Sequence, residues 1–139
     1  MKLRLTLVGA VVVALVAAFS AYGYYSSAGA GVGDATVGTL NPATDVTVPA
    51  SSTGTVHVSW TAAAAGPNAI APVGYHVERS AGGPAWVSVC ASTPSASIDA
   101  TSCDDTIAAA GDYTYRVTAV YHSWTATSAT SSSVHVVTD

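Results

Sequence analysis

One segment of the chain, from Gly111 to Tyr121, constrains the fold more than any other. Polar residues alternate there with an apolar or aromatic set made of Tyr113, Tyr115, Val117, Ala119 and Tyr121. A period of two residues is typical of a β-strand with one buried face. We therefore predict that this segment is a central strand and that its odd-numbered side chains enter the core.

Several other segments alternate in the same way and are separated by Gly, Pro and Ser turns, without a helical period between them. Residues 34–40 are consistent with either a short strand or a linker. The remaining predicted strands are residues 45–48, 55–61, 75–79, 85–90, 97–101 and 133–137. Short strands at this spacing predict an all-β fold, a seven-stranded antiparallel sandwich.

The order of aromatic and apolar residues in these strands resembles the immunoglobulin-like fibronectin type III domain over residues 42–139. The resemblance lies in Val56-x-Val58-x-Trp60, in Gly74-Tyr75-x-Val77, and in Ile107 six positions before Tyr113. It implies that Trp60 anchors the core and that Tyr113 forms a tyrosine corner, with its hydroxyl bonded to upstream backbone. The expected structural core residues are Trp60, Tyr75, Tyr113, Tyr115 and Val117.

The N-terminus predicts export. Lys2 and Arg4 precede an uninterrupted apolar run over residues 5–19. About 15 apolar residues suit a signal peptide, whereas counting on to Tyr25 reaches the roughly 20 residues of a membrane span. We divide the chain into residues 1–25, a hydrophobic signal or anchor helix, residues 26–41, a flexible linker, and residues 42–139, the domain. Either alternative places the domain outside, with signal peptidase and the export machinery as partners and membrane contact only through residues 5–25.

The leader also resembles the leaders of exported bacterial biofilm-fibre subunits, whose signals are removed by a dedicated peptidase. The resemblance lies in Ala21-Tyr22, the Gly/Ser spacer that follows, and residues 35–40. It implies a cell-surface or matrix component.

Two cysteines, Cys90 and Cys103, are the only ones in the chain. In an exported protein such a pair predicts one disulfide, because the compartment is oxidising. The loop of roughly 13 residues that it closes corresponds to about 3 kcal/mol of stabilisation. A redox pair would favour Cys-x-x-Cys, and a zinc site would need more ligands at matching spacing.

The remaining polar residues do not form a catalytic or metal-binding pattern. His57, His76 and His135 fall at outward strand positions and His122 in a loop, so we expect four exposed histidines. Four aspartates are expected at one end of the sandwich, as solvated turn residues or as calcium ligands, although their spacing lacks the pattern of a calcium loop. They are Asp99, Asp104, Asp105 and Asp112.

Catalysis and nucleic-acid binding are both unsupported. Glu78 is the only glutamate, and no serine lies in a Gly-x-Ser-x-Gly elbow. Beyond the leader the only Lys or Arg residues are Arg79 and Arg116, too few to neutralise phosphates. We therefore expect no enzyme activity, no cofactor and no nucleic-acid partner.

The remaining candidates for a functional role are aromatic residues that could lie on the surface. Trp86 and Trp124 are not required by the core pattern, so they either pack over the sandwich edge or contact a partner. We predict a non-catalytic module, secreted or at the cell surface, with a structural or adhesive role and possible self-assembly. The alternative is a carbohydrate-binding or protein-binding module that uses exposed aromatic residues.

Overall fold

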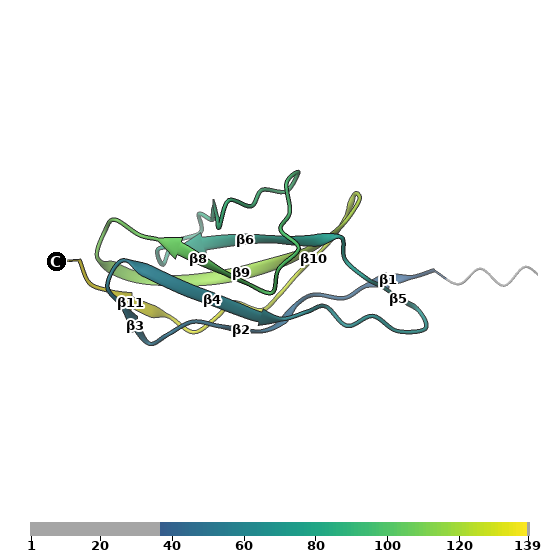
Figure 1. The fold of residues 1–139 in the computed structure, drawn as a ribbon, viewed down its shortest axis with the longest axis horizontal. Coiled ribbons are helices and arrows are strands. Elements are labelled where there is room, and N and C mark those ends of the chain that lie inside the picture. The colour runs from purple at the N-terminus through teal and green to yellow at the C-terminus, as the bar shows by residue number, and fades with distance from the viewer. Residues whose placement is uncertain (1–36, 139) are drawn as a thin grey trace, which may run out of the picture. The chain divides into compact units, whose positions relative to one another are not determined.

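The computed structural model describes residues 37–138, and this part of the chain is built from strands alone. Figure 1 shows the arrangement. The strands are β1 (Thr39–Leu40), β2 (Thr44–Thr47), β3 (Ser51–Ser52), β4 (Thr55–Thr61), β5 (Ala69–Ile70), β6 (Gly74–Ser80), β7 (Val87–Val89), β8 (Ser102–Thr106), β9 (Gly111–Tyr121), β10 (Trp124–Thr127) and β11 (Val134–Val136).

Two sheets form the sandwich. The smaller has the order β2-β4-β8, and the larger has the order β3-β11-β9-β6-β7, with β10 also paired to β9. The short strands β1 and β5 form a separate parallel pair at the end of the domain opposite the C-terminus (Figure 1). All other pairings are antiparallel except β3 with β11, which agrees with the predicted all-β antiparallel sandwich.

The predicted central strand is confirmed, except that Tyr121 at its end is half-buried and is not part of the core. β9 covers Gly111–Tyr121 and lies between β6 on one side and β10 and β11 on the other. Of its inward side chains, Tyr115, Val117 and Ala119 have no exposed surface. They pack against the inward side chains of β4 in one continuous core. Burying each large apolar side chain contributes about 1.5–3 kcal/mol relative to leaving it in water.

The expected tyrosine corner is present at the start of β9. The Tyr113 hydroxyl donates a hydrogen bond to the backbone oxygen of Ala109 at 3.0 Å. The ring itself is 8% exposed and lies in the core. This bond fixes the turn that carries the chain from β8 into β9.

The fifth strand was predicted at the wrong place. We expected residues 97–101, whereas the strand is β8, Ser102–Thr106. Ile98 instead pairs alone with Tyr75 at the edge of β6. The pattern misled because Asp104 and Asp105 are poor strand residues by propensity, and their cross-strand partners override that preference.

The strand count also differs from the predicted seven, because β10 is added ahead of the predicted last strand and three two-residue strands are added elsewhere. Between β10 and β11 the chain bulges away from β9. There the side-chain oxygens of Ser128 and Ser131 accept hydrogen bonds from the amides of Val117 and Tyr115, each at 3.0 Å. The serine side chains take the place of backbone acceptors, so the strand is interrupted without leaving β9 unpaired.

The expected signal or anchor helix lies outside the described residues. Residues 37–138 contain no helix long and apolar enough to cross a membrane. The segment 34–40, for which a strand and a linker were both open, forms β1 over Thr39–Leu40, and Leu40 packs against the core.

Candidate functional site

Trp86 directly precedes β7 and lies on the outer face of the larger sheet, against Arg116 of β9. Its ring covers the guanidinium of Arg116, whose Cζ is 4.3 Å from the ring centroid. Arg116 in turn donates from Nε to Glu78 Oε2 at 2.8 Å. Trp86 is therefore half-buried, and it orders a neutral ion pair beneath it. A cation–π contact at such a site is worth about 0.5–1 kcal/mol.

Trp124 behaves differently, because 44% of its surface is exposed. It begins β10 and pairs with Tyr121 across the hairpin. The register places Trp86 level with Thr114 and on the opposite edge of the sheet. Thr114 and Tyr121 lie roughly 20 Å apart along β9, at about 3.3 Å per residue. The two tryptophans thus do not form one flat platform.

The predicted core aromatics lie where they were expected. Trp60 is 6% exposed and meets Tyr75 edge-to-face, with ring centroids 5.5 Å apart. The Tyr75 hydroxyl accepts a hydrogen bond from the amide of Ala63 at 2.9 Å. These contacts fix the chain as it leaves β4, so Trp60 and Tyr75 are structural and not available to a ligand.

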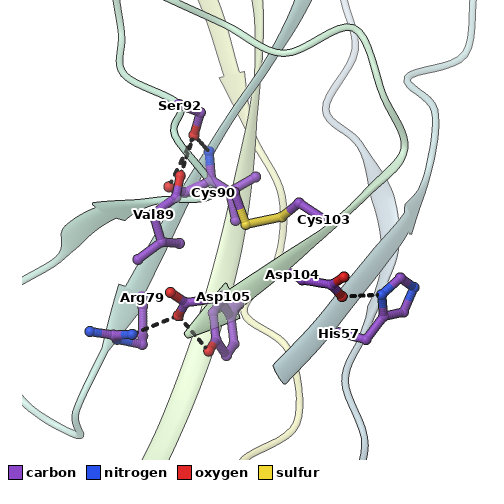
Figure 2. Close-up of a disulfide and its surroundings, with 10 residues drawn as sticks. His57, Arg79, Val89, Cys90, Ser92, Cys103, Asp104 and Asp105 are labelled. Atoms are coloured by element: carbon purple, nitrogen blue, oxygen red, sulfur yellow. Dashed lines mark hydrogen bonds and ion pairs between the residues drawn. A yellow bond between two sulfur atoms is a disulfide. The ribbon is translucent and has the colours of Figure 1, made fainter. Parts of the chain in front are cut away.

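The Cys90–Cys103 disulfide is present and joins the two sheets (Figure 2). Cys103 belongs to β8, and Cys90 lies in the tight turn after β7. Cys90 and Ala91 both adopt positive φ, at 59° and 51°. Two consecutive non-glycine residues in this region are unfavourable, so the turn needs support from its surroundings.

Ser92 supplies part of that support, and sequence reasoning missed it. It is only 2% exposed. Its hydroxyl donates to Val89 O at 2.8 Å (Figure 2). It also accepts a hydrogen bond from the amide of Val77 at 2.8 Å. The side chain therefore replaces a strand residue beside β6. A serine within a Ser/Thr-rich loop carries no local signal for this role, because the contact depends on the disulfide-closed turn.

A buried polar cluster also joins the sheets, and the sequence did not predict it. Asp105 on β8 is 6% exposed, and its Oδ2 accepts from Arg79 Nη1 at 2.6 Å and from the Tyr115 hydroxyl at 2.9 Å. Arg79 also lies over the Tyr113 ring, 5.2 Å from its centroid. Burial first, and then the bond to Asp105, raises the pKa of Tyr115 well above its ordinary value.

The expectation that all four aspartates are solvated turn residues is thus wrong for Asp105, which is buried. It is also wrong for Asp104 and Asp112, which are exposed but lie in β8 and β9. Asp105 enters the core because its position alternates with Cys103 and Ile107, which also face inward. Among residues 37–138 no group of three or more His, Cys, Asp or Glu side chains is arranged to hold a metal ion.

The histidines are exposed except for His76, where the prediction was wrong. His57 and His135 lie beside Asp104 and Asp112, at 2.6 and 2.8 Å. His76 is 5% exposed and hydrogen-bonds through Nε2 to Ser88 Oγ at 2.9 Å. An outward position does not imply exposure in the middle of a wide sheet, where neighbouring strands flank the ring.

Desolvation is the main influence on His76 and lowers the pKa of its imidazole below the ordinary value. The nearby Glu78 opposes that shift and Arg116 adds to it. A serine within hydrogen-bond reach of a neutral histidine is one part of a nucleophilic site. Within the described residues, however, no hydrogen bond joins the imidazole Nδ1 to a carboxylate that would orient it. The contact gives the His76 imidazole and the Ser88 hydroxyl a hydrogen-bond partner each.

A hollow of about 430 Å³ lies between the start of the domain and the bulge after β10. It is lined by Pro42, Ala43, Thr44, Asp45, Val46, Ser128, Ala129 and Thr130. Small side chains dominate this lining, and neither Trp86 nor Trp124 belongs to it. The exposed aromatic residue and the hollow are therefore separate features.

Comparison with known proteins shows the fold. No protein-family model and no curated protein sequence matches the chain. Among solved structures, the chain is similar to a fibronectin type III domain of human collagen XX, with 19% identity and a TM-score of 0.51, over 75% of this chain and 99% of that one. It is also similar to the FN1–FN3 domains of chicken CNTN1, with 15% identity and a TM-score of 0.53, over 68% of this chain.

Titin gives two further matches of the same kind. Domains A168–A170 match at 20% identity and a TM-score of 0.57, over 73% of this chain. The titin kinase with its flanking domains matches at 22% identity and a TM-score of 0.56, over 71% of this chain. The chain spans 17% of the titin kinase structure, 33% of A168–A170 and 32% of the CNTN1 structure. Residues 37–138 thus have the fibronectin type III fold, a β-sandwich.

Proposed function

We propose that this chain is a non-catalytic, exported module with a structural or adhesive role, either released or held at the cell surface. The Cys90–Cys103 disulfide is the observation that carries the proposal. Disulfides persist in oxidising compartments and are rare in reducing ones. The apolar run over residues 5–19 behind Lys2 and Arg4 supports the same location.

The way the two sheets are joined supports a structural role. The disulfide and the Asp105–Arg79 ion pair both run from β8 to the opposite sheet. A module that bears load or resists proteolysis outside a cell benefits from such links, because they oppose separation of the sheets. The collagen XX and CNTN1 domains share this fold, which is compatible with the role.

The alternative of a glycan-binding module has less support. A stacking platform for a sugar needs exposed aromatic rings on one surface. Trp86 is instead committed to Arg116, and Trp124 lies at the other edge of the sheet. Trp124 alone, 44% exposed, remains a candidate contact for another protein.

The proposal is tested by intact-mass measurement on the protein recovered from the membrane, medium and cytoplasmic fractions of a native-like host. Full-length chain in the membrane fraction would indicate an anchored module. A shorter chain in the medium, beginning between Ala21 and Gly31, would indicate a secreted one. In both cases the mass is expected about 2 Da below the reduced value, because the disulfide has formed. Full-length chain with two free thiols in the cytoplasm would overturn the proposal.

A further inference from the structure

β7 forms one edge of the larger sheet, and the geometry of β6 shows which of its backbone groups face outward. The Tyr75 amide and carbonyl bond to Ile98, so they point away from β9. Two-residue alternation gives Arg79 the same direction, toward its partner Val87. The backbone N–H and C=O of Val87 therefore face β6, whereas the N–H and C=O of Ser88 point away from the sheet edge. Residues 37–138 provide no backbone partner for Ser88 on that side.

Several of the other sheet edges carry devices that discourage pairing with another chain. β11 is covered by β3, and the rest of β6 is covered by Ile98 and Ser92. β8 presents an exposed carboxylate at Asp104. β2 is broken by Asp45, with φ of 52°, and is followed by Pro49. Charges, prolines, irregular residues and covering segments are the usual means by which natural sheets avoid edge-to-edge association.

β7 carries neither a charge nor a proline, although it has only three residues and is followed by Cys90 and Ala91 at positive φ. Residues 85–90 read Ala-Trp-Val-Ser-Val-Cys, without a charge or a proline. Val87 is 57% exposed, on the rim of the sandwich. An uncharged segment with two β-branched valines at an open edge has the composition that favours strand pairing.

We propose that β7 is the surface through which two copies of this chain associate, by antiparallel pairing of their β7 edges about a two-fold axis near Ser88. The two larger sheets would then form one continuous sheet across both copies. The inference rests on the proposed structural or adhesive role, and it identifies the partner as a second copy.

Self-complementarity favours a second copy over another partner. With the axis at Ser88, the outward amide and carbonyl of this residue meet their counterparts, and Val87 of one copy comes beside Val89 of the other. Within residues 37–138 an acidic partner would find no free Lys or Arg, because Arg79 and Arg116 are each paired within the chain. The exposed carboxylates at Asp104 and Asp112 lie on β8 and β9, and β7 itself carries no charge, so the two paired strands do not repel each other.

The interface is small. Two strands of three residues bury less than the roughly 1,000 Å² that a stable dimer needs. The association is therefore expected to be weak in dilute solution. The dimer becomes populated where chains are concentrated on one surface, because tethering raises their effective concentration to about the millimolar range.

Site-directed cross-linking of the full chain in phosphatidylcholine vesicles tests the proposal. Ser88→Cys places a thiol at the axis, where facing residues of a hydrogen-bonded antiparallel pair have Cα atoms about 5.5 Å apart, within disulfide range. Thr106→Cys, on the acidic β8 edge, is the matched control. Under mild oxidation we expect dimer from the first variant in at least five-fold excess over the second, with peptide mapping that locates the link at position 88.

A second substitution separates edge pairing from association through the N-terminal run. Val87→Lys adds a charge to an exposed position, so the fold is retained, and in the Ser88→Cys background it is expected to reduce the dimer at least five-fold. Thr125→Lys, also exposed, is expected to leave the dimer unchanged. Equal cross-linking at positions 88 and 106, no dimer at position 88, or a dimer insensitive to Val87→Lys would overturn the proposal. Because the vesicles hold purified protein, these outcomes do not depend on where a host cell places the chain.

Discussion

Asp105 on β8 and Arg79 on β6 are joined by an ion pair of 2.6 Å that crosses the sandwich from one sheet to the other. The carboxylate is nearly enclosed, and the same oxygen also receives the Tyr115 hydroxyl. The pair is therefore a cross-link between sheets, and its two partners cannot be removed independently without leaving a polar group in the core.

Asp105→Ala is expected to lower the free energy of unfolding by about 3 kcal/mol, because Arg79 and Tyr115 both lose their partner in a buried setting. Asp104→Ala is the matched control: it lies one residue away with an exposed side chain, and we expect a change within about 0.5 kcal/mol. Urea unfolding followed by circular dichroism measures both. Equal losses for the two variants would show that the cross-sheet ion pair adds no more to the free energy of unfolding than an exposed carboxylate does.

Removal of the disulfide by the double substitution Cys90→Ala with Cys103→Ala is expected to cost about 3 kcal/mol of stability on the chain-entropy model. The effect should be concentrated near β6. Amide exchange at Tyr75 and Val77 is expected to accelerate more than at Val117, since Ile98 and Ser92 cover those amides from within the closed loop. Unchanged exchange at Tyr75 and Val77 would show that the loop holds its place without the bridge.

Ser92→Ala is expected to destabilise the fold by about 1–3 kcal/mol, because it leaves the Val77 amide buried without a partner. Ser95→Ala, in the same loop but exposed, is the control and should be close to neutral. Thermal unfolding of the two variants provides the comparison. A neutral Ser92→Ala would mean that water or the backbone takes over the bond.

Ser92 and Asp105 also show how much of the structure could be predicted from the sequence. The period of two in β9, the Trp60 and Tyr113 positions and the single cysteine pair are local or pairwise signals, and each was predicted correctly. Ser92 and Asp105 could not be predicted in the same way. Their roles depend on which polar group from a distant strand meets them, and a serine or aspartate in a turn-rich sequence looks the same whether it is solvated or buried.

His76 gives the fold a pH dependence. Its pKa is lowered by burial, so the unfolded chain binds a proton more readily than the folded one. The contribution to stability is complete above the ordinary histidine pKa of 6.5 and is lost as the pH falls through the lower folded value. We expect His76→Gln to flatten the stability profile below pH 6.5, whereas His122→Gln, in the exposed hairpin turn, leaves it unchanged. Urea midpoints measured across this pH range provide the test. If both variants kept the wild-type dependence of stability on pH, the pH dependence would not come from His76.

Trp124 should dominate the solvent-accessible fluorescence of the domain. Of the three tryptophans in the chain, Trp60 is 6% exposed, Trp86 is half-buried over Arg116, and Trp124 is 44% exposed. Acrylamide quenches by collision, so its effect follows access to the ring. Trp124→Phe is expected to remove most of the quenchable emission, while Trp86→Phe, its matched counterpart at the other edge, removes much less. If Trp86→Phe instead caused the larger loss of quenchable emission, the stacking of Trp86 on Arg116 would be transient. The outer face of the larger sheet would then again be a candidate contact surface for sugars.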